Sequence, residues 1–223
     1  MSTVLKYPKK SHRKQISIPS VSEDLAEFLG IEFGDGGIGN PWQVVISLNS
    51  KSDAEYAMHI QRLIKRLFSI VSVLRKRPNQ NTLVIVCSSM NLVDFLVGKG
   101  AVRGNKVLQR IDVPGWIRTN PAYQKAFVRG LVDTDGCLYI HNHVIKGIRY
   151  RNIGLCFTSS SKPLVTSTSI ILKKFGVEPH ITDEHRRIYL YSGDAVSRYL
   201  RVFGSSNSRI LDKYKEWRGA RVA

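Results

Sequence analysis

The chain has 223 residues, enough for one large domain or two of about 100 residues each. Hydrophobic residues make up 43% and charged residues 23% of it, which excludes disorder of the whole chain. Lys and Arg total 34 against 17 Asp and Glu, and a net charge of +17 indicates a polyanionic partner, either nucleic acid or an acidic membrane surface.

The expected cellular compartment follows from the missing membrane and signal segments and from the cysteines. No apolar run reaches the roughly 18 residues of a membrane span, and no apolar signal core stands at the N-terminus. The cysteines are three in number and form no Cys-x-x-Cys pair, so we expect small buried side chains in a reducing, intracellular compartment, and neither zinc ligands nor disulfides. They are Cys87, Cys137 and Cys156.

Residues 1–19 form a basic arm without an acid, either a solvated tail or an extension along phosphates. Its basic residues are Lys6, Lys9, Lys10, His12, Arg13 and Lys14. The capping pattern Ser20-x-x-Glu23, with Ser22 as a competing cap, then predicts a helix that ends at Asp35-Gly36. Because this helix is apolar nearly all round, it should be buried on more than one side.

Alternating and helical periods predict the rest of the first half. The expected elements are a strand at 42–49, a helix at 53–68, strands at 70–77 and 83–87, and a short helix at 91–97.

The pattern restarts with a helix at 121–134 that ends in Asp135-Gly136. Strands at 137–143 and 148–158, a helix at 163–175, a hairpin turning at 183–187 and returning along 188–191, and helices at 194–203 and 207–218 follow. We therefore expect an α+β fold of two pseudo-symmetric αββαββα halves, each with an antiparallel, saddle-shaped sheet. The expected boundaries are 20–104, a linker at 105–120, and 121–223.

The repeat places Asp35 and Asp135 at matching helix ends. Gly30 and Gly130 have no Cβ, so the two helices could pack closely and bring both carboxylates together. Helix C-termini carry partial negative charge, so such a pair requires cations, and hard divalent ions such as Mg²⁺ take oxygen ligands. In so basic a chain, this pair suggests phosphodiester hydrolysis by metal-activated water.

These residues also carry a family resemblance. VRGLVDTDG (128–136) resembles the LAGLIDADG motif, and FLGIEFGDG (28–36) resembles a divergent first copy with Glu32-Phe33 in place of an apolar residue and an acid. Residues 20 to about 218 therefore resemble a single-chain, two-motif LAGLIDADG homing endonuclease.

The resemblance implies a pseudo-twofold monomer whose central motif helices pack together, with each sheet in the DNA major groove. Asp35 and Asp135 would bind Mg²⁺ with the backbone carbonyls of Gly34 and Thr134, and cleavage would leave short 3′ overhangs. Mn²⁺ would substitute for Mg²⁺, whereas Ca²⁺ would support binding without cleavage. A basic residue from each half would stand near the scissile phosphate, with Lys106 and Arg209 as candidates.

Candidate DNA contacts lie on strands and at strand-to-helix corners. Arg75 and Arg77 share a strand face, as do Arg149 and Arg151, and arginines on a sheet suit bidentate contacts with guanine or phosphate. The second pair alternates in phase with inward-facing apolar residues, so either a bulge intervenes or the strand overhangs the core. The other candidates are Gln43, Ser47, Asn49, Lys51, Tyr139, His141, His143, Ser159, Arg186 and Arg187.

Three functions compete. The first is an endonuclease acting on a duplex DNA target of asymmetric or pseudo-palindromic sequence. The second is a maturase that binds host intron RNA, and the third is a non-catalytic binding protein. Retention of both Asp35 and Asp135 favours the nuclease. A membrane partner is disfavoured, because no basic amphipathic helix with an exposed aromatic face is evident.

Overall fold

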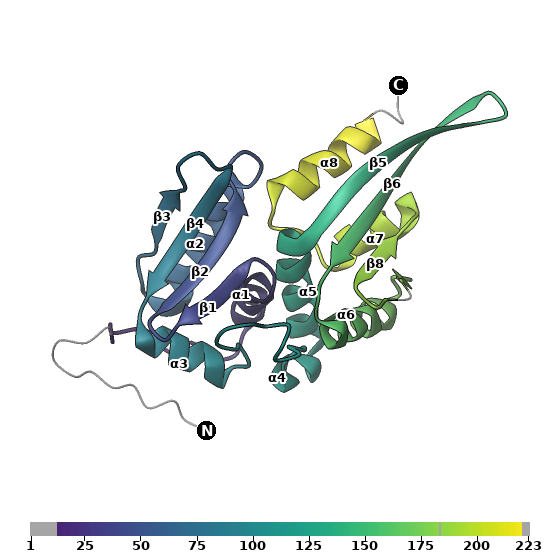
Figure 1. Ribbon diagram of the computed structural model, residues 1–223. Helices are drawn as coiled ribbons and strands as arrows, with labels where there is room; N and C mark the ends of the chain where they lie inside the picture. Colours follow the sequence, from purple (N-terminus) through teal and green to yellow (C-terminus); the bar gives the residue numbers. More distant parts are fainter. Residues whose placement is uncertain (1–12, 183, 220–223) are drawn as a thin grey trace.

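The computed structural model describes residues 13–182 and 184–219, which form two halves of like topology (Figure 1). In the first half, the antiparallel sheet has the strand order β1-β2-β4-β3. Its elements are α1 (Glu23–Phe33), β1 (Gly36–Asn40), β2 (Gln43–Asn49), α2 (Ala54–Phe68), β3 (Val73–Lys76), β4 (Thr82–Ser88) and α3 (Met90–Gly98).

The second half repeats this plan with the strand order β5-β6-β8-β7. Its elements are α5 (Pro121–Asp135), β5 (Gly136–Ile145), β6 (Ile148–Thr158), α6 (Lys162–Lys174), β7 (His180–Ile181), β8 (Arg187–Leu190), α7 (Gly193–Val202) and α8 (Ser208–Gly219). A short helix, α4 (Gly115–Arg118), lies between the halves in the sequence. The predicted fold class of two pseudo-symmetric α+β halves is confirmed.

Two elements escaped sequence analysis. Strand β1 has the sequence GGIGN, in which glycines leave no alternation of apolar and polar side chains to detect. Helix α4 has only four residues, too few for a helical period. Strand β3 is also shorter than the predicted 70–77. Ser22 rather than Ser20 caps α1, because the side chain of Ser22 accepts a hydrogen bond from the Leu25 amide.

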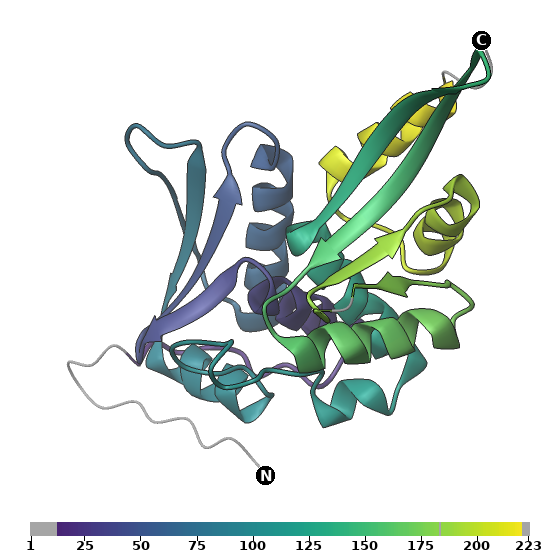
Figure 2. The same ribbon diagram turned by 45° about the vertical axis from the view of Figure 1, so that its right-hand side comes forward.

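Helices α1 and α5 lie side by side between the two sheets (Figures 1 and 2). Their contact is reciprocal about the pseudo-twofold axis. A Cβ on Gly30 would lie less than 3.0 Å from the Phe127 carbonyl oxygen, and a Cβ on Gly130 equally close to the Glu27 carbonyl oxygen. The two backbones therefore touch at the glycines, as the sequence predicts.

A buried ion pair also joins the halves at this interface. Glu27 is 4% exposed and accepts hydrogen bonds from Arg129 at 2.5 Å, His59 at 2.9 Å and Ser206 at 2.7 Å. Burial alone would raise the pKa of Glu27, but the hydrogen bond from His59 and the charge of Arg129 lower it to about 2.

We expect Glu27→Gln to lower the free energy of unfolding by about 3 kcal/mol at pH 7, because Arg129 loses its buried partner. A carboxyl with a lowered pKa stabilises the fold above its unfolded value of 4.5 and loses this effect as the pH falls toward about 2. The difference between the proteins in urea unfolding should therefore shrink below pH 4.5. Asp24→Asn, which breaks an exposed ion pair with Arg66, is the control and should cost less than about 1 kcal/mol.

The hairpin of β5 and β6 extends beyond the body of the second half (Figure 1). Pairing runs without a shift from Gly136↔Phe157 to Ile145↔Ile148, so no bulge interrupts it. The far end of the hairpin extends beyond the core. Arg149 and Arg151 can therefore share the face of the inward-pointing apolar residues without being buried. The turn at Lys146-Gly147 has positive φ at both residues, as a two-residue hairpin turn requires.

The cysteine prediction is wrong in part. Cys87 is buried, but Cys137 is exposed and Cys156 half-buried, because both lie on the outer face of the sheet as a cross-strand pair. All three thiols are free.

The predicted arm falls mostly outside the described residues, including Lys6, Lys9, Lys10 and His12. Within the described part of the arm, Arg13 forms an ion pair with Asp94, and the Lys14 carbonyl oxygen accepts a hydrogen bond from the Asn91 side chain. Within the described chain, no helix is long and apolar enough to cross a membrane.

Candidate active site

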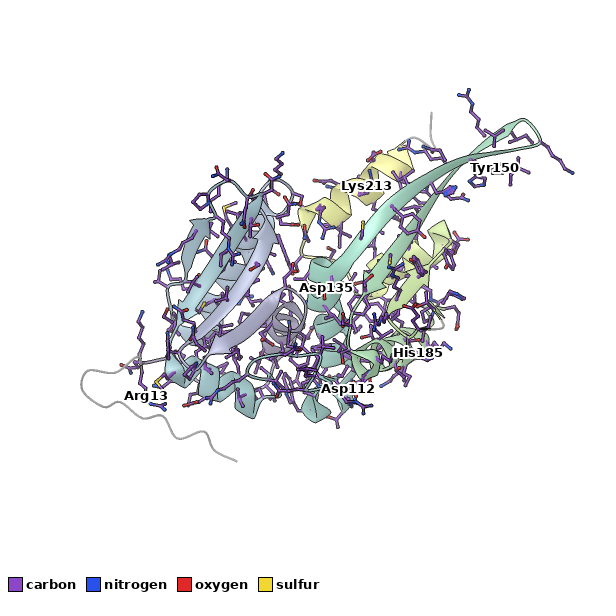
Figure 3. The ribbon with its side chains drawn as sticks, in the orientation of Figure 1. Arg13, Asp112, Asp135, Tyr150, His185 and Lys213 are labelled. Carbon is purple, nitrogen blue, oxygen red and sulfur yellow. The ribbon has the colours of Figure 1, made fainter. Side chains whose placement is uncertain are left out.

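The two motif aspartates stand at the ends of the packed helices. Asp35 follows Gly34, the C-cap of α1, and Asp135 is the last residue of α5. Figure 3 places Asp135 at the centre of the molecule, between the halves. A Cβ on Gly34 would lie 3.4 Å from Asp135 Cγ, which shows how closely the two helix ends approach.

Both carboxylates are poorly stabilised as anions. Burial raises the pKa of Asp135 to about 7, with a further rise from Asp35. Burial and the charge of Asp53 raise the pKa of Asp35 to about 6. Within the described part of the chain, neither side chain accepts a hydrogen bond, so their charge must be balanced by something else.

Lys106 provides one balancing charge. Its Nζ donates to the carbonyl oxygens of Glu32, Phe33, Gly34 and Gly36 at 2.7–2.9 Å, and so caps the C-terminus of α1. Burial lowers its pKa, while the charges of Glu32 and both motif aspartates oppose that change. The sequence candidate Lys106 is therefore beside both carboxylates.

Arg209 has the matching place at the end of α5. Its guanidinium donates to the carbonyl oxygens of Gly136 at 3.2 Å and Asp133 at 3.3 Å. Unlike Lys106, it also forms an ion pair, since Nε donates to Asp53 Oδ1 at 3.0 Å. The two basic candidates are thus related by pseudo-symmetry but differ in their electrostatic partners.

Asp53 is the residue that sequence analysis missed. It is 7% exposed, and Oδ1 also accepts from Asn207 Nδ2 at 3.0 Å, while Oδ2 accepts from Asn49 N at 3.3 Å and Ser52 Oγ at 3.0 Å. With all these bonds satisfied, Asp53 holds Arg209 in place. The one available signal was an acid at the first position of the predicted helix at 53–68.

The remaining acid of the second motif, Asp133, has a structural role. Asp133 is 1% exposed and accepts from Ser205 Oγ and Ser206 N. Its counterpart Phe33 instead packs edge-on against Phe127, with ring centroids 5.5 Å apart. The missing acid of the first motif is therefore replaced by an aromatic residue that packs in the core.

The donor set fits a hard cation. Asp135 lines a hollow of about 250 Å³ together with Gly34, Lys106 and Ser159. Neither Asp135 nor Asp35 accepts a hydrogen bond from the described residues, so both carboxylates keep oxygens free for a cation. No group of three His, Cys, Asp or Glu side chains suited to a metal occurs in the described chain, so backbone carbonyls would have to complete the site. Thr134 lies at the same helix end, whereas the Gly34 carbonyl already accepts from Lys106.

The register of the first sheet gathers its DNA candidates on one outer face. Ser47 of β2 pairs with Val84 of β4, which pairs with Arg75 of β3, so Ser47 and Arg75 lie on the same face. Gln43 and Asn49 alternate in phase with Ser47 and lie on this face too. Arg77 continues the alternation of Arg75 just beyond the end of β3. The opposite face carries Val44 and Ile46, which are buried in the core.

In the second sheet, only some of the candidate DNA contacts lie on the outer face. Tyr139, His141 and His143 lie on the outer face, to which Arg187 also belongs. Arg149 and Arg151 lie on the opposite face, and Arg151 forms an ion pair with Glu216 of α8. The structure therefore does not bring these two arginines onto the outer surface. The remaining candidates, at turns and strand ends, are Lys51, Ser159 and Arg186.

Comparisons with known proteins agree with this geometry. Residues 122–214 match the family model described as a LAGLIDADG-like domain. No curated protein matches the chain. This match lies within the second half of the chain.

Solved structures extend the likeness to both halves. I-DmoI in complex with DNA and Mn is 22% identical, with a TM-score of 0.54 over 84% of this chain and 99% of that chain. The I-LtrWI LAGLIDADG homing endonuclease bound to target DNA is 11% identical, with a TM-score of 0.59 over 89% of each chain. Full-length DUF199/WhiA from Thermatoga maritima is 16% identical, with a TM-score of 0.54 over 92% of this chain and 63% of that chain. The chain thus has the fold of LAGLIDADG homing endonucleases, as its two motifs predict.

Proposed function

We propose that the protein is a monomeric, site-specific DNA endonuclease that hydrolyses one phosphodiester in each strand, using divalent metal and leaving short 3′ overhangs. The observation that carries the proposal is the pair formed by Asp35 and Asp135. These two partly buried carboxylates accept no hydrogen bond from the described residues, and they lie at the pseudo-twofold axis of a chain with net charge +17.

In this proposal the sheets and the ends of the central helices have separate roles. The outer faces of both sheets bind the duplex, while Asp35, Asp135 and adjoining backbone carbonyls hold the cations. Bound Mg²⁺ would lower the pKa of water and neutralise developing charge on the phosphate. Lys106 and Arg209 keep positive charge beside the carboxylates, which favours approach of the DNA backbone.

The test is cleavage of a plasmid that carries the fused flanks of the host gene, the expected uninterrupted intron-homing site. Linear product in Mg²⁺ or Mn²⁺, and binding without cleavage in Ca²⁺, would support the proposal. Tight binding without cleavage in any metal would indicate a non-catalytic DNA-binding protein. Binding of the host intron transcript instead of this DNA would indicate a maturase.

The ion pair of Asp53 and Arg209 gives a strand-specific prediction. Asp53→Asn removes the charge that orients Arg209 and leaves Lys106 unaffected, because Lys106 has no such partner among the described residues. We expect one strand to be cut about tenfold more slowly, as a loss of about 1.4 kcal/mol would produce.

The measurement is accumulation of nicked plasmid before linear product, with each strand labelled separately. Asp212→Asn, which removes an exposed carboxylate paired with Lys215, is the control and should slow neither strand. Equal slowing of both strands by Asp53→Asn would mean that Asp53 acts only through overall stability.

A further inference from the structure

The outer face of the first sheet carries guanidinium and amide groups among its valines. Arg75 lies on this face two strands away from Ser47 and Asn49, and Gln43 Nε2 donates to Ser88 Oγ at 3.2 Å. In the major groove, arginine forms paired hydrogen bonds with guanine, and Asn or Gln does so with adenine. This face therefore suits a half-site that contains guanine and adenine at contacted positions.

The outer face of the second sheet has a different chemistry. His143 stacks on Tyr150 with ring centroids 5.4 Å apart, and Tyr189 stacks on Tyr191 at 5.2 Å. Among the described strand residues of this face, Arg187 is the single Lys or Arg, and it lies at the inner end beside Thr158. The face therefore offers rings where the first sheet offers guanidinium groups.

Apolar groups continue this face to the tip of the hairpin. Ile145 and Ile148 form the last pair before the turn and are 51% and 59% exposed. Figure 3 labels Tyr150 near this end, beyond the core. Nearer the core, Tyr139, His141 and Tyr191 line a hollow of about 440 Å³. Exposed aromatic and aliphatic groups in the major groove contact the C5-methyl group of thymine.

The hairpins also differ in length. Strand β1 has 5 residues, whereas β5 has 10. At about 3.3 Å per residue, the additional strand length corresponds to about five base pairs of duplex, which rises about 3.4 Å per pair.

We infer that the DNA target, on the function proposed above, is asymmetric in both length and base composition. The half-site under the second sheet is longer by about five base pairs, is rich in A·T pairs and is read through thymine methyl groups. The half-site under the first sheet is shorter and includes guanine, which Arg75 contacts.

Selection of bound duplexes from a randomised pool, with the full chain and Ca²⁺, tests this composition. We expect one half of the selected site to be longer and enriched in A·T. Replacing dT by dU there removes only methyl groups and should weaken binding roughly fourfold per contacted methyl. The same replacement in the shorter half should leave binding unchanged, which makes it the internal control.

Two variants then connect each half-site to its sheet. Replacing residues 144–149 by Asn-Gly joins the paired residues His143 and Tyr150 through a two-residue turn. This shortened hairpin should lose the outermost base preferences of the A·T-rich half alone, and Arg75→Ala should lose guanine preference in the other half. Thermal unfolding of both variants should match that of the wild type, because the replaced side chains lie outside the core.

The outcomes separate the two levels of the argument. If the wild-type chain selects no sequence, the proposed site-specific function fails. If it selects a site whose halves are alike, or if the shortened hairpin alters the guanine-containing half, the function stands and the asymmetry is wrong.

Discussion

Asp35→Asn and Asp135→Asn are each expected to reduce double-strand cleavage by at least about a thousandfold, while binding of target DNA persists. Each change removes an anionic ligand from a site where the cation supplies several kcal/mol of transition-state stabilisation, and each 1.36 kcal/mol is about tenfold in rate. Binding persists because the sheet surfaces are untouched and one negative charge near the phosphates is lost. The measurements are single-turnover cleavage in Mg²⁺ and equilibrium binding in Ca²⁺.

The same two substitutions have a second expected effect. Both carboxyls have raised pKa values in the fold, so the unfolded chain releases its protons first, and stability falls as the pH rises from the unfolded value of 3.8 to about 7. In chelator, Asp135→Asn should therefore increase the free energy of unfolding by about 2 kcal/mol at pH 8, with no gain below pH 4.

A misfolded variant would lose cleavage, but it would not become more stable in the absence of metal. The two effects together therefore exclude misfolding as the cause of the lost cleavage. Asp212→Asn, on the exposed surface, should change neither property. Residual cleavage within tenfold of the wild type in either motif variant would contradict the two-carboxylate site.

Local sequence patterns account for the parts of the site that could be predicted. Gly30 and Gly130 are needed where two backbones touch, and an acid five residues beyond each glycine then falls at the helix end. Lys106 and Arg209 were weaker candidates, yet they occupy matching places on the two carbonyl clusters.

The remainder depends on contacts between distant residues. Asp53 and Arg209 are 156 residues apart, and nothing near either residue indicates the other. For Arg151, the alternation was visible in the sequence, but its partner Glu216 belongs to a helix whose position depends on how α8 packs against the hairpin. Pairing across the chain therefore decides which basic residues face the ligand.

Gly30→Ala and Gly130→Ala are expected to destabilise the protein by about 3 kcal/mol or more each, and to abolish cleavage. Helix propensity alone would favour alanine by about 1 kcal/mol, so the intrinsic effect has the opposite sign. The added methyl group would lie less than 3.0 Å from a backbone carbonyl of the facing helix. Backbone atoms cannot rotate away as a side chain can, so the helices must separate, at a cost typical of severe overpacking.

Separation of α1 and α5 would also move Asp35 away from Asp135, because each aspartate is fixed at the end of its helix. The measurement is thermal unfolding, in which about 3 kcal/mol lowers the midpoint by roughly 10 °C for a chain of this size. Gly115→Ala, in a helix where the new Cβ would meet nothing within 4 Å, is the matched control and should leave the midpoint nearly unchanged. Pseudo-symmetry makes the two central variants equivalent, so a large effect at Gly130 with none at Gly30 would contradict the reciprocal contact. Wild-type midpoints for both would show that the helices can separate at little cost, and that close packing does not hold the carboxylates together.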